Sequence, residues 1–212
     1  MKVLLLGATG ATGKDLLELL LKDDEIQQLD VFVRRNPGIQ NERLKIHVID
    51  FDNPDEWKEY VKGDVLFSCL GTTRKLAGSK ESQWKVDHTY QYQFAKAARE
   101  HGVPCYVLVS AINAAAKSPF FYSRMKGQLD EDVRALHFNK LIIFRPPLLL
   151  RGGAERPTEV QGARIIGFFN RMGLLRAQKP ISTIRLAEAM ISSVKVLKDG
   201  IYCIPGQKIL DF

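Results

Sequence analysis

The sequence has few cysteines and no long apolar run, and each of these absences excludes a class of protein. Three cysteines in 212 residues, with no CxxC spacing, argue against a disulfide framework or a zinc site. The first apolar run ends at Gly7, short of the roughly 7–15 residues of a signal-peptide core. No stretch approaches the ~20 apolar residues that span a bilayer. We therefore expect a cytoplasmic protein without a membrane span and without a bound metal.

The positive charge is concentrated rather than spread along the chain. The formal net charge is +7, and the stretch from Arg145 to Arg185 holds eight basic residues but only two acidic ones. Such a stretch is either a solvated basic face or a surface that attracts an anionic cofactor or substrate. No nucleic-acid motif accompanies the charge, so we expect no nucleic-acid partner.

Short aliphatic runs alternate with longer amphipathic stretches along the whole chain. Strands this apolar are buried on both faces, which is typical of a parallel sheet between helix layers. The pattern predicts an α/β, doubly wound, mainly parallel sheet with helices on both faces. We expect one domain over residues 1–212, with a small substrate-side portion from about residue 150. Strands are predicted at Lys2–Leu6, Asp30–Arg34, Lys45–Ile49, Asp64–Cys69, Cys105–Val109, Leu141–Arg145 and Ile201–Cys203, and helices at Gly13–Lys22, Pro54–Val61, Gln83–His101, Tyr122–Leu136, Val160–Met172 and Thr183–Leu197.

A glycine-rich turn, Gly7-Ala8-Thr9-Gly10-Ala11-Thr12-Gly13, follows the first predicted strand and opens the first helix. Glycines let the backbone turn tightly and approach a diphosphate, and the helix N-terminus offers free N–H groups. Thr9 and Thr12 add hydroxyl donors. The turn predicts a Rossmann-type dinucleotide site, whereas the absence of a Gly-Lys-Ser/Thr ending argues against a nucleoside triphosphatase.

The end of the second strand bears on which dinucleotide binds. Proteins that bind NAD typically carry an Asp or Glu about 20 residues after the glycine turn, where its carboxylate binds the ribose hydroxyls. An arginine near that place instead suits the 2′-phosphate of NADP. Here Arg34 and Arg35 stand at that place, and Asp30 opens the strand at its other end. The pattern favours NADP(H), with solvated loop charges as the alternative. Asp50-Phe51 ends the third strand, where the carboxylate either accepts from adenine or caps the turn.

A tyrosine with a lysine four residues later suggests the reaction centre. This spacing places an ammonium beside a phenol on one helix face, and the phenol can then act as proton donor to a carbonyl. Two such pairs occur, Tyr92/Lys96 and Tyr122/Lys126. Only Tyr122 follows the fifth strand, on the side of a parallel sheet where ligands bind. Ser110 closes that strand and is a candidate to hold the substrate carbonyl.

These residues together resemble the short-chain dehydrogenase/reductase superfamily in its atypical or extended branch, and more closely the Tat-interacting-protein-like oxidoreductases. The narrower resemblance rests on the glycine turn, Arg34-Arg35, Asp50-Phe51, Cys69-Leu70-Gly71-Thr72-Thr73-Arg74, Tyr122 with Lys126-Gly127, Phe144-Arg145-Pro146 and Glu155-Arg156-Pro157.

The resemblance implies a role for each of these positions. It implies that Tyr122 is the proton donor and acceptor and that Lys126 binds the ribose. It also implies NADP contacts at Thr9, Gly10, Ala11, Thr12, Arg34, Arg35, Leu70, Gly71, Leu149 and Arg156. Two departures stand out: Ala111 follows Ser110 where relatives often carry a second serine, and Asp87 stands where many carry asparagine.

Three functions follow from this pattern. The first is an NADPH-dependent carbonyl reductase acting on a small molecule, which is anionic if the basic stretch binds it. The second is an NADPH-dependent binding module that recruits a protein partner with little or no catalysis. The third is a nucleotide-sugar epimerase, which the short portion after Leu150 argues against. By analogy with the superfamily, two of the predicted helices can pair in a homodimer.

Overall fold

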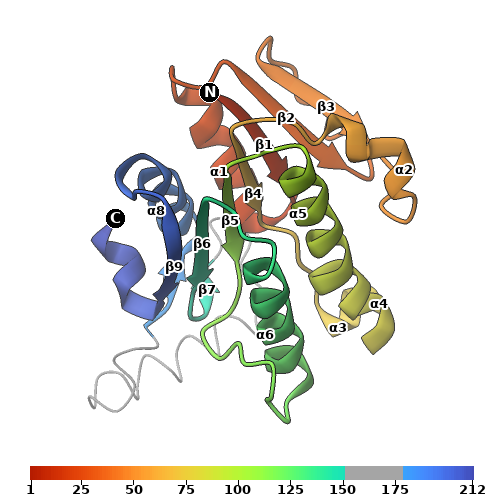
Figure 1. Ribbon diagram of the computed structural model, residues 1–212, viewed down its shortest axis with the longest axis vertical. Helices are drawn as coiled ribbons and strands as arrows, with labels where there is room; N and C mark the ends of the chain where they lie inside the picture. The colour runs from red at the N-terminus through yellow and green to blue at the C-terminus, as the bar shows by residue number, and fades with distance from the viewer. Residues whose placement is uncertain (151–178) are drawn as a thin grey trace.

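The computed structural model describes residues 1–150 and 179–212, and within them one seven-stranded sheet organises the fold (Figure 1). The strand order is β3-β2-β1-β4-β5-β6-β9, and every neighbouring pair is parallel. The strands are β1 Lys2–Leu6, β2 Gln28–Val33, β3 Leu44–Val48, β4 Val65–Ser68, β5 Cys105–Val109, β6 Lys140–Arg145 and β9 Gly200–Pro205. A separate short pair joins β7 Leu149–Leu150 to β8 Ile181–Ser182.

Helices cover both faces of this sheet, as the sequence predicts. Helices α1 (Ala11–Lys22) and α8 (Thr183–Val196) contact each other on one face, and α5 (Tyr90–Glu100) contacts α6 (Phe121–Arg134) on the other (Figure 1). Shorter helices are α2 Pro54–Trp57, α3 Arg74–Ala77 and α4 Lys80–Trp84, with 3-10 turns at Lys58–Tyr60 and Gly206–Asp211. The predicted doubly wound α/β fold is therefore confirmed.

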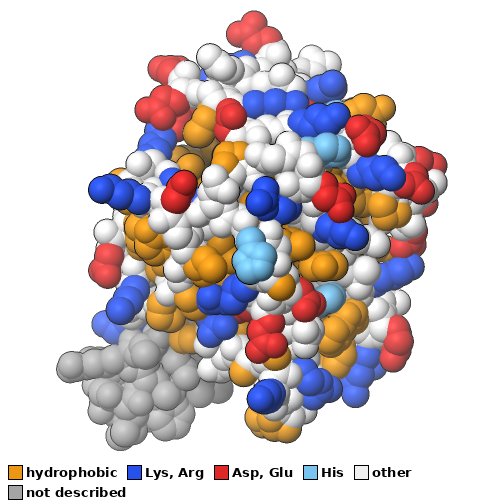
Figure 2. Space-filling view, viewed as in Figure 1, with side chains coloured by type: hydrophobic (Ala, Val, Ile, Leu, Met, Phe, Trp, Pro, Cys, Tyr) orange, Lys and Arg blue, Asp and Glu red, His pale blue; other side chains and the backbone are white. Residues whose placement is uncertain are grey.

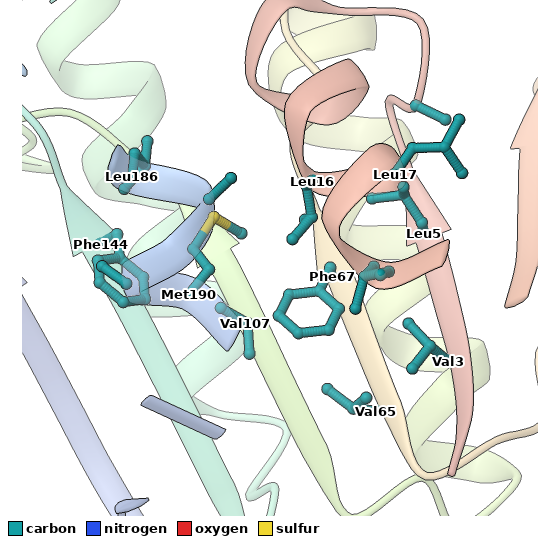
Figure 3. Packing of buried hydrophobic residues seen from close by; sticks show 14 of the residues in the cluster. Val3, Leu5, Leu16, Leu17, Val65, Phe67, Val107, Phe144, Leu186 and Met190 are labelled. Carbon is teal, nitrogen blue, oxygen red and sulfur yellow. The ribbon is translucent and has the colours of Figure 1, made fainter. Parts of the chain in front are cut away.

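Two apolar clusters lie on opposite faces of the sheet because side chains alternate along each strand. In β1, Val3 and Leu5 belong to the cluster under α1 and α8, whereas Leu4 and Leu6 belong to the one under α5 and α6. Figure 3 shows the first cluster, where Met190 of α8 lies among side chains of the sheet and α1. Burial on both faces fixes the strand register, which holds the carboxyl ends of the strands at one edge.

The surface visible in Figure 2 mixes charges of both signs. Basic and acidic side chains are interspersed over this face instead of being gathered by sign. The predicted helix Val160–Met172 and most of the basic residues between Arg145 and Arg185 lie outside the described residues.

Two predicted elements differ from the structure in a way that matters later. The predicted helix Gln83–His101 is a longer helical run in which a π-helical turn, Lys85–Thr89, joins α4 to α5. The second strand begins at Gln28, so Asp30 does not open it but lies within it. Asp30 is tolerated there because His47 Nε2 lies 3.1 Å and Lys2 Nζ 3.5 Å from its carboxylate. These partners come from neighbouring strands, and a buried carboxylate requires them.

Candidate functional site

The glycine turn after β1 has a geometry that larger residues cannot adopt. Gly7 has a φ of +86°, and a Cβ atom on it would lie 2.6 Å from the carbonyl carbon of Cys69. A Cβ atom on Gly13 would lie 2.0 Å from the carbonyl oxygen of Gly7. Both positions therefore require glycine, the first for its backbone conformation and the second for the close approach of α1 to the turn.

The N-terminus of α1 is open to a ligand. Gly10 is the N-cap and forms no side-chain cap, and the first turn holds no acidic residue. The first intrahelical bond runs from the N–H of Lys14 to the carbonyl of Gly10 (2.9 Å), so the preceding amides have no intrahelical acceptor. Free amides at a helix N-terminus favour an anion such as a diphosphate. The turn lies where the strand order reverses between β1 and β4, the usual ligand position in such sheets.

A cavity of about 530 Å³ extends from this turn past the carboxyl ends of β4, β5 and β6. It brings together predicted site residues from five separate segments. These are Gly10, Ala11, Thr12, Leu70, Gly71, Ser110, Tyr122, Lys126 and Leu149. Its wall also includes residues that the sequence did not assign to the site, among them Thr72, Asp87, Asn113, Pro146 and Thr183. Their position directly after strand ends, or on a helix beside them, is the signal that could have found them.

The Tyr122/Lys126 pair lies one turn apart on α6 and faces this cavity. Tyr122 is 45% exposed, whereas Lys126 is 3% exposed. Helix α6 comes close to the loop after β5 because Gly127 has no side chain, since a Cβ atom there would lie 2.2 Å from the main chain of Ala115. The other pair, on α5, is not part of the cavity wall, and Lys96 Nζ lies 3.9 Å from Glu100 instead. Position therefore separates the two pairs as the sequence predicts.

A carboxylate that the sequence did not place in the site holds the lysine. The Lys126 Nζ atom lies 3.4 Å from Asp87 Oδ1, and both side chains are buried. Burial opposes the charge on Lys126, but electrostatic interactions, foremost with Asp87, outweigh it and raise the pKa of the lysine. Burial also raises the pKa of Asp87, against the influence of Lys126 and the Thr72 amide. We therefore assign a charged ammonium to Lys126 in the cavity wall.

Ser110 lies at the cavity wall beside a second buried carboxylate. The Ser110 Oγ and Asp130 Oδ1 atoms are buried and have no hydrogen-bond partner among the described residues. The other oxygen of Asp130 accepts from Arg145 Nε at 2.9 Å and lies 2.8 Å from Arg145 Nη2. Burial raises the pKa of Asp130, and Ser110 and Arg145 oppose this. The Ser110 hydroxyl therefore lies beside Asp130, from where it can also reach a ligand in the cavity.

Leu70 and Gly71, which the resemblance places beside the adenine ribose, line this cavity, whereas the other residues predicted for the adenosine end lie outside it. Arg34 and Arg35 are exposed directly after β2. Asp50 Oδ1 accepts from the Asp52 amide at 2.9 Å, which fits the turn-capping alternative. The Phe51 side chain is buried against Tyr90 and Phe94, so only its main chain can face a ligand. Gly7 and Thr9 lie in the turn, Gly13 lies at the start of α1, and Arg156 lies outside the described residues.

Comparisons with known proteins agree with this geometry. The sequence profile of a family described as NAD(P)H-binding matches residues 7–168. Protein FMP52 of Candida albicans is 32% identical over 227 residues, covering 99% of this chain and 97% of that protein. Protein FMP52 of Meyerozyma guilliermondii is 40% identical over 154 residues, covering 71% of this chain and 66% of that protein.

Solved structures show the same fold at low sequence identity. UDP-glucuronic acid 4-epimerase from Bacillus cereus, in complex with NAD, superposes with a TM-score of 0.72 at 16% identity, covering 100% of this chain and 80% of that one. The dTDP-glucose 4,6-dehydratase DesIV from Streptomyces venezuelae, with NAD bound, superposes with a TM-score of 0.73 at 16% identity, covering 95% of this chain and 74% of that one. These likenesses confirm the Rossmann-type α/β fold.

One prediction about the cell is wrong. The FMP52 relatives are named mitochondrial, which contradicts the cytoplasmic location expected from the sequence. That expectation rested on the lack of a leader-like apolar run, and this lack does not exclude a mitochondrial protein, since transit peptides are amphipathic rather than apolar. Among the described helices, none is long and apolar enough to cross a membrane. In the same residues, no group of three or more His, Cys, Asp or Glu side chains is placed to hold a metal ion.

Proposed function

The chain belongs to the NAD(P)H-binding family, with the fungal FMP52 proteins as relatives, and we propose that it is an NADPH-dependent oxidoreductase of the short-chain dehydrogenase type. Its proposed substrate is a small molecule with a carbonyl group. The observation that carries this proposal is that the Tyr122 phenol, the Lys126 ammonium and the open N-terminus of α1 all line one cavity.

The residues present fit the proposed cofactor. Gly7 and Gly13 let the turn pack tightly against the start of α1, because a Cβ atom at either position would clash with the protein's own main chain, and the free amides of α1 suit a diphosphate. Arg34 and Arg35 are exposed beside the expected place of the adenosine ribose and suit a 2′-phosphate. When bound, the reduced nicotinamide supplies a hydride to the carbonyl carbon.

The chain's own side chains would then complete the reduction. Tyr122 gives its hydroxyl proton to the carbonyl oxygen as the hydride reaches the carbon, so the product is an alcohol and the tyrosine is left as phenolate. The charged Lys126 stabilises that phenolate, which regains a proton from solvent because Tyr122 is half exposed. The hydroxyl of Ser110 orients the carbonyl from the end of β5.

Substitution of the tyrosine tests this proposal. A panel of aldehydes and ketones is offered with NADPH, and its oxidation is followed by absorbance. Tyr122→Phe should lower kcat by roughly 10²–10⁴-fold, the usual contribution of a general acid. It should leave the affinity for NADPH nearly unchanged. Tyr92→Phe, in the pair outside the cavity, is the matched control and should keep the wild-type rate. Equal rates for wild type and Tyr122→Phe would refute the role of the phenol.

A second function, cofactor-dependent recruitment of a partner with little turnover, is favoured by one observation. The ammonium that the resemblance assigns to the ribose is already paired with Asp87, so part of its charge is balanced before a ligand arrives. This alternative predicts NADPH binding without turnover of any carbonyl in the panel.

We also propose a closer group of relatives and a location in the cell. The sequence Cys69-Leu70-Gly71-Thr72-Thr73-Arg74, whose first five residues line the cavity, supports a place near the Tat-interacting-protein-like oxidoreductases. The names of the FMP52 relatives support a mitochondrial location. Fractionation of cells that express the full chain tests the location.

A further inference from the structure

The buried pair of Asp87 and Lys126 joins two parts of the cavity that are far apart in the sequence. Asp87 is 1% exposed and lies before α5, whereas Lys126 is on α6. A buried lysine keeps its charge only when a partner compensates for the loss of water. The Asp87 carboxylate, whose Oδ1 atom lies 3.4 Å from the Lys126 ammonium, provides this compensation.

The π-helical turn Lys85–Thr89 carries Asp87 and sets where it points. Turns of this kind insert an extra residue into a helix and are frequent at functional sites. A buried chain of hydrogen bonds holds the turn in place: Ser68 Oγ donates to Gln91 Oε1 (2.7 Å), and Gln91 Nε2 donates to the Asp87 carbonyl (2.7 Å). The main chain of Asp87 is thus fixed to the end of β4.

The second carboxylate oxygen of Asp87 binds the loop that follows β4. The Thr72 amide donates to Asp87 Oδ2 at 2.9 Å. A Cβ atom on Gly71 would lie 3.2 Å from Asp87 Oδ1, so this loop passes directly over the carboxylate. Leu70, Gly71 and Thr72 all line the cavity. One side chain therefore holds both the cofactor-side loop and the lysine of α6.

From this geometry we propose that Asp87 is a positioning residue, whose carboxylate fixes the Lys126 ammonium and the Leu70–Thr73 loop relative to each other. The inference rests on the proposed function for its purpose, since the fixed lysine is the group that would meet the ribose and the tyrosine. An asparagine can accept the Thr72 hydrogen bond equally well, but it cannot balance the charge of the lysine. The negative charge is therefore the property that aspartate contributes at this position and asparagine does not.

The other charged and titratable groups near Lys126 do not replace Asp87. Tyr122 and Asp130 lie on the same helix, and Asp130 is bound to Arg145. The Cys69 thiol faces the lysine from the end of β4, and burial raises its pKa to about 12, so it stays neutral. Loss of the Asp87 charge would leave burial as the main influence and lower the pKa of Lys126.

Acylation of lysines in the cofactor-free protein tests the proposal without relying on activity. Wild type and Asp87→Asn are treated with acetic anhydride over a range of pH, and the modification of Lys126 is measured by peptide mass spectrometry. Only the neutral amine reacts, so a pKa lower by one unit increases the rate about tenfold at a pH well below the pKa. We expect Asp87→Asn to accelerate the modification of Lys126 at least tenfold at neutral pH.

Asp132→Asn is the matched control, because Asp132 lies on α6 but pairs with His88 at 2.7 Å. It should leave the modification of Lys126 unchanged. An unchanged Lys126 rate in Asp87→Asn, or an equal increase in both variants, would overturn the proposal. If Asp87→Asn does not fold, the double variant Asp87→Asn/Lys126→Met should fold, because it removes the unpaired charge as well. Failure of the double variant to fold would also overturn it.

Titration with NADPH separates this proposal from the proposed function. Asp87→Asn should raise the Kd for NADPH about tenfold, and Asp132→Asn should not change it. If wild type binds no nicotinamide nucleotide, the proposed function fails, while the acylation result still decides the role of Asp87. If wild type binds NADPH but Asp87→Asn binds it equally well, the positioning role fails and the proposed function stands.

Discussion

Replacement of Gly13 by alanine probes the packing of α1 on the glycine turn. A Cβ atom at this position would lie 2.0 Å from the carbonyl oxygen of Gly7 and 2.7 Å from its carbonyl carbon. This main chain cannot easily retreat, because Gly7 itself lies against the carbonyl of Cys69. The helix must therefore shift away from the turn or the turn must distort.

Two opposing contributions give the expected magnitude. Alanine is favoured over glycine within a helix by about 1 kcal/mol. Overpacking against a fixed backbone costs about 3 kcal/mol, the upper end of the usual range. The net loss in the free energy of unfolding is about 2 kcal/mol, which corresponds to a Tm lower by about 4–8 °C for a chain of this length. Affinity for NADPH should fall as well, because the helix amides move.

Urea unfolding and calorimetric titration measure these two effects. Gly10→Ala is the graded comparison, since its Cβ atom would lie 3.3 Å from the Gly7 oxygen and needs only a small adjustment. It should destabilise the protein less than Gly13→Ala does. If Gly13→Ala were as stable as wild type and bound NADPH equally well, the described contact between turn and helix would be wrong.

Further predictions concern Asp30 within β2, the end of α1 and the choice between NADPH and NADH. Hydrogen bonds and nearby charges, foremost that with His47, lower the pKa of Asp30 although burial opposes this. A lowered pKa adds stability that is complete above the unfolded pKa of about 3.9 and is lost as pH falls through the folded value. Asp30→Asn should therefore lower the free energy of unfolding at pH 7, and the difference from wild type should shrink in urea titrations below about pH 4. Arg43 donates to three main-chain carbonyls at and after the end of α1, so Arg43→Ala should cost about 1–3 kcal/mol in the same assay, and no loss would contradict this capping. Replacing Arg34 and Arg35 by serine should weaken NADPH binding at least tenfold without weakening NADH binding, whereas equal weakening of both would contradict a role at the 2′-phosphate.

Local patterns predicted much of the frame and part of the site. The bounds of β1 and β5 agree with the prediction because each is a short apolar run that ends at a glycine or a polar residue. The glycine turn and the Tyr122/Lys126 pair lie together as predicted, since parallel strands bring their carboxyl ends to one edge.

Features that depend on distant partners could not be predicted in the same way. Asp30 within β2 is stabilised by side chains of two other strands, and the sequence alone does not show them together. The π-helical turn has no local signature in the sequence, yet it directs Asp87 to Lys126. In the sequence Asp87 stands out only as a departure from the family pattern, because its contact with Lys126 joins two helical segments that are far apart in the chain.

Calorimetric titration of the cofactor-free protein with NADPH and then NADH tests the central claim most directly. We predict saturable binding of one NADPH per chain, with at least tenfold weaker binding of NADH. Absence of binding by either nucleotide would contradict a dinucleotide site at the glycine turn. A preference for NADH would contradict the role given to the two arginines after β2.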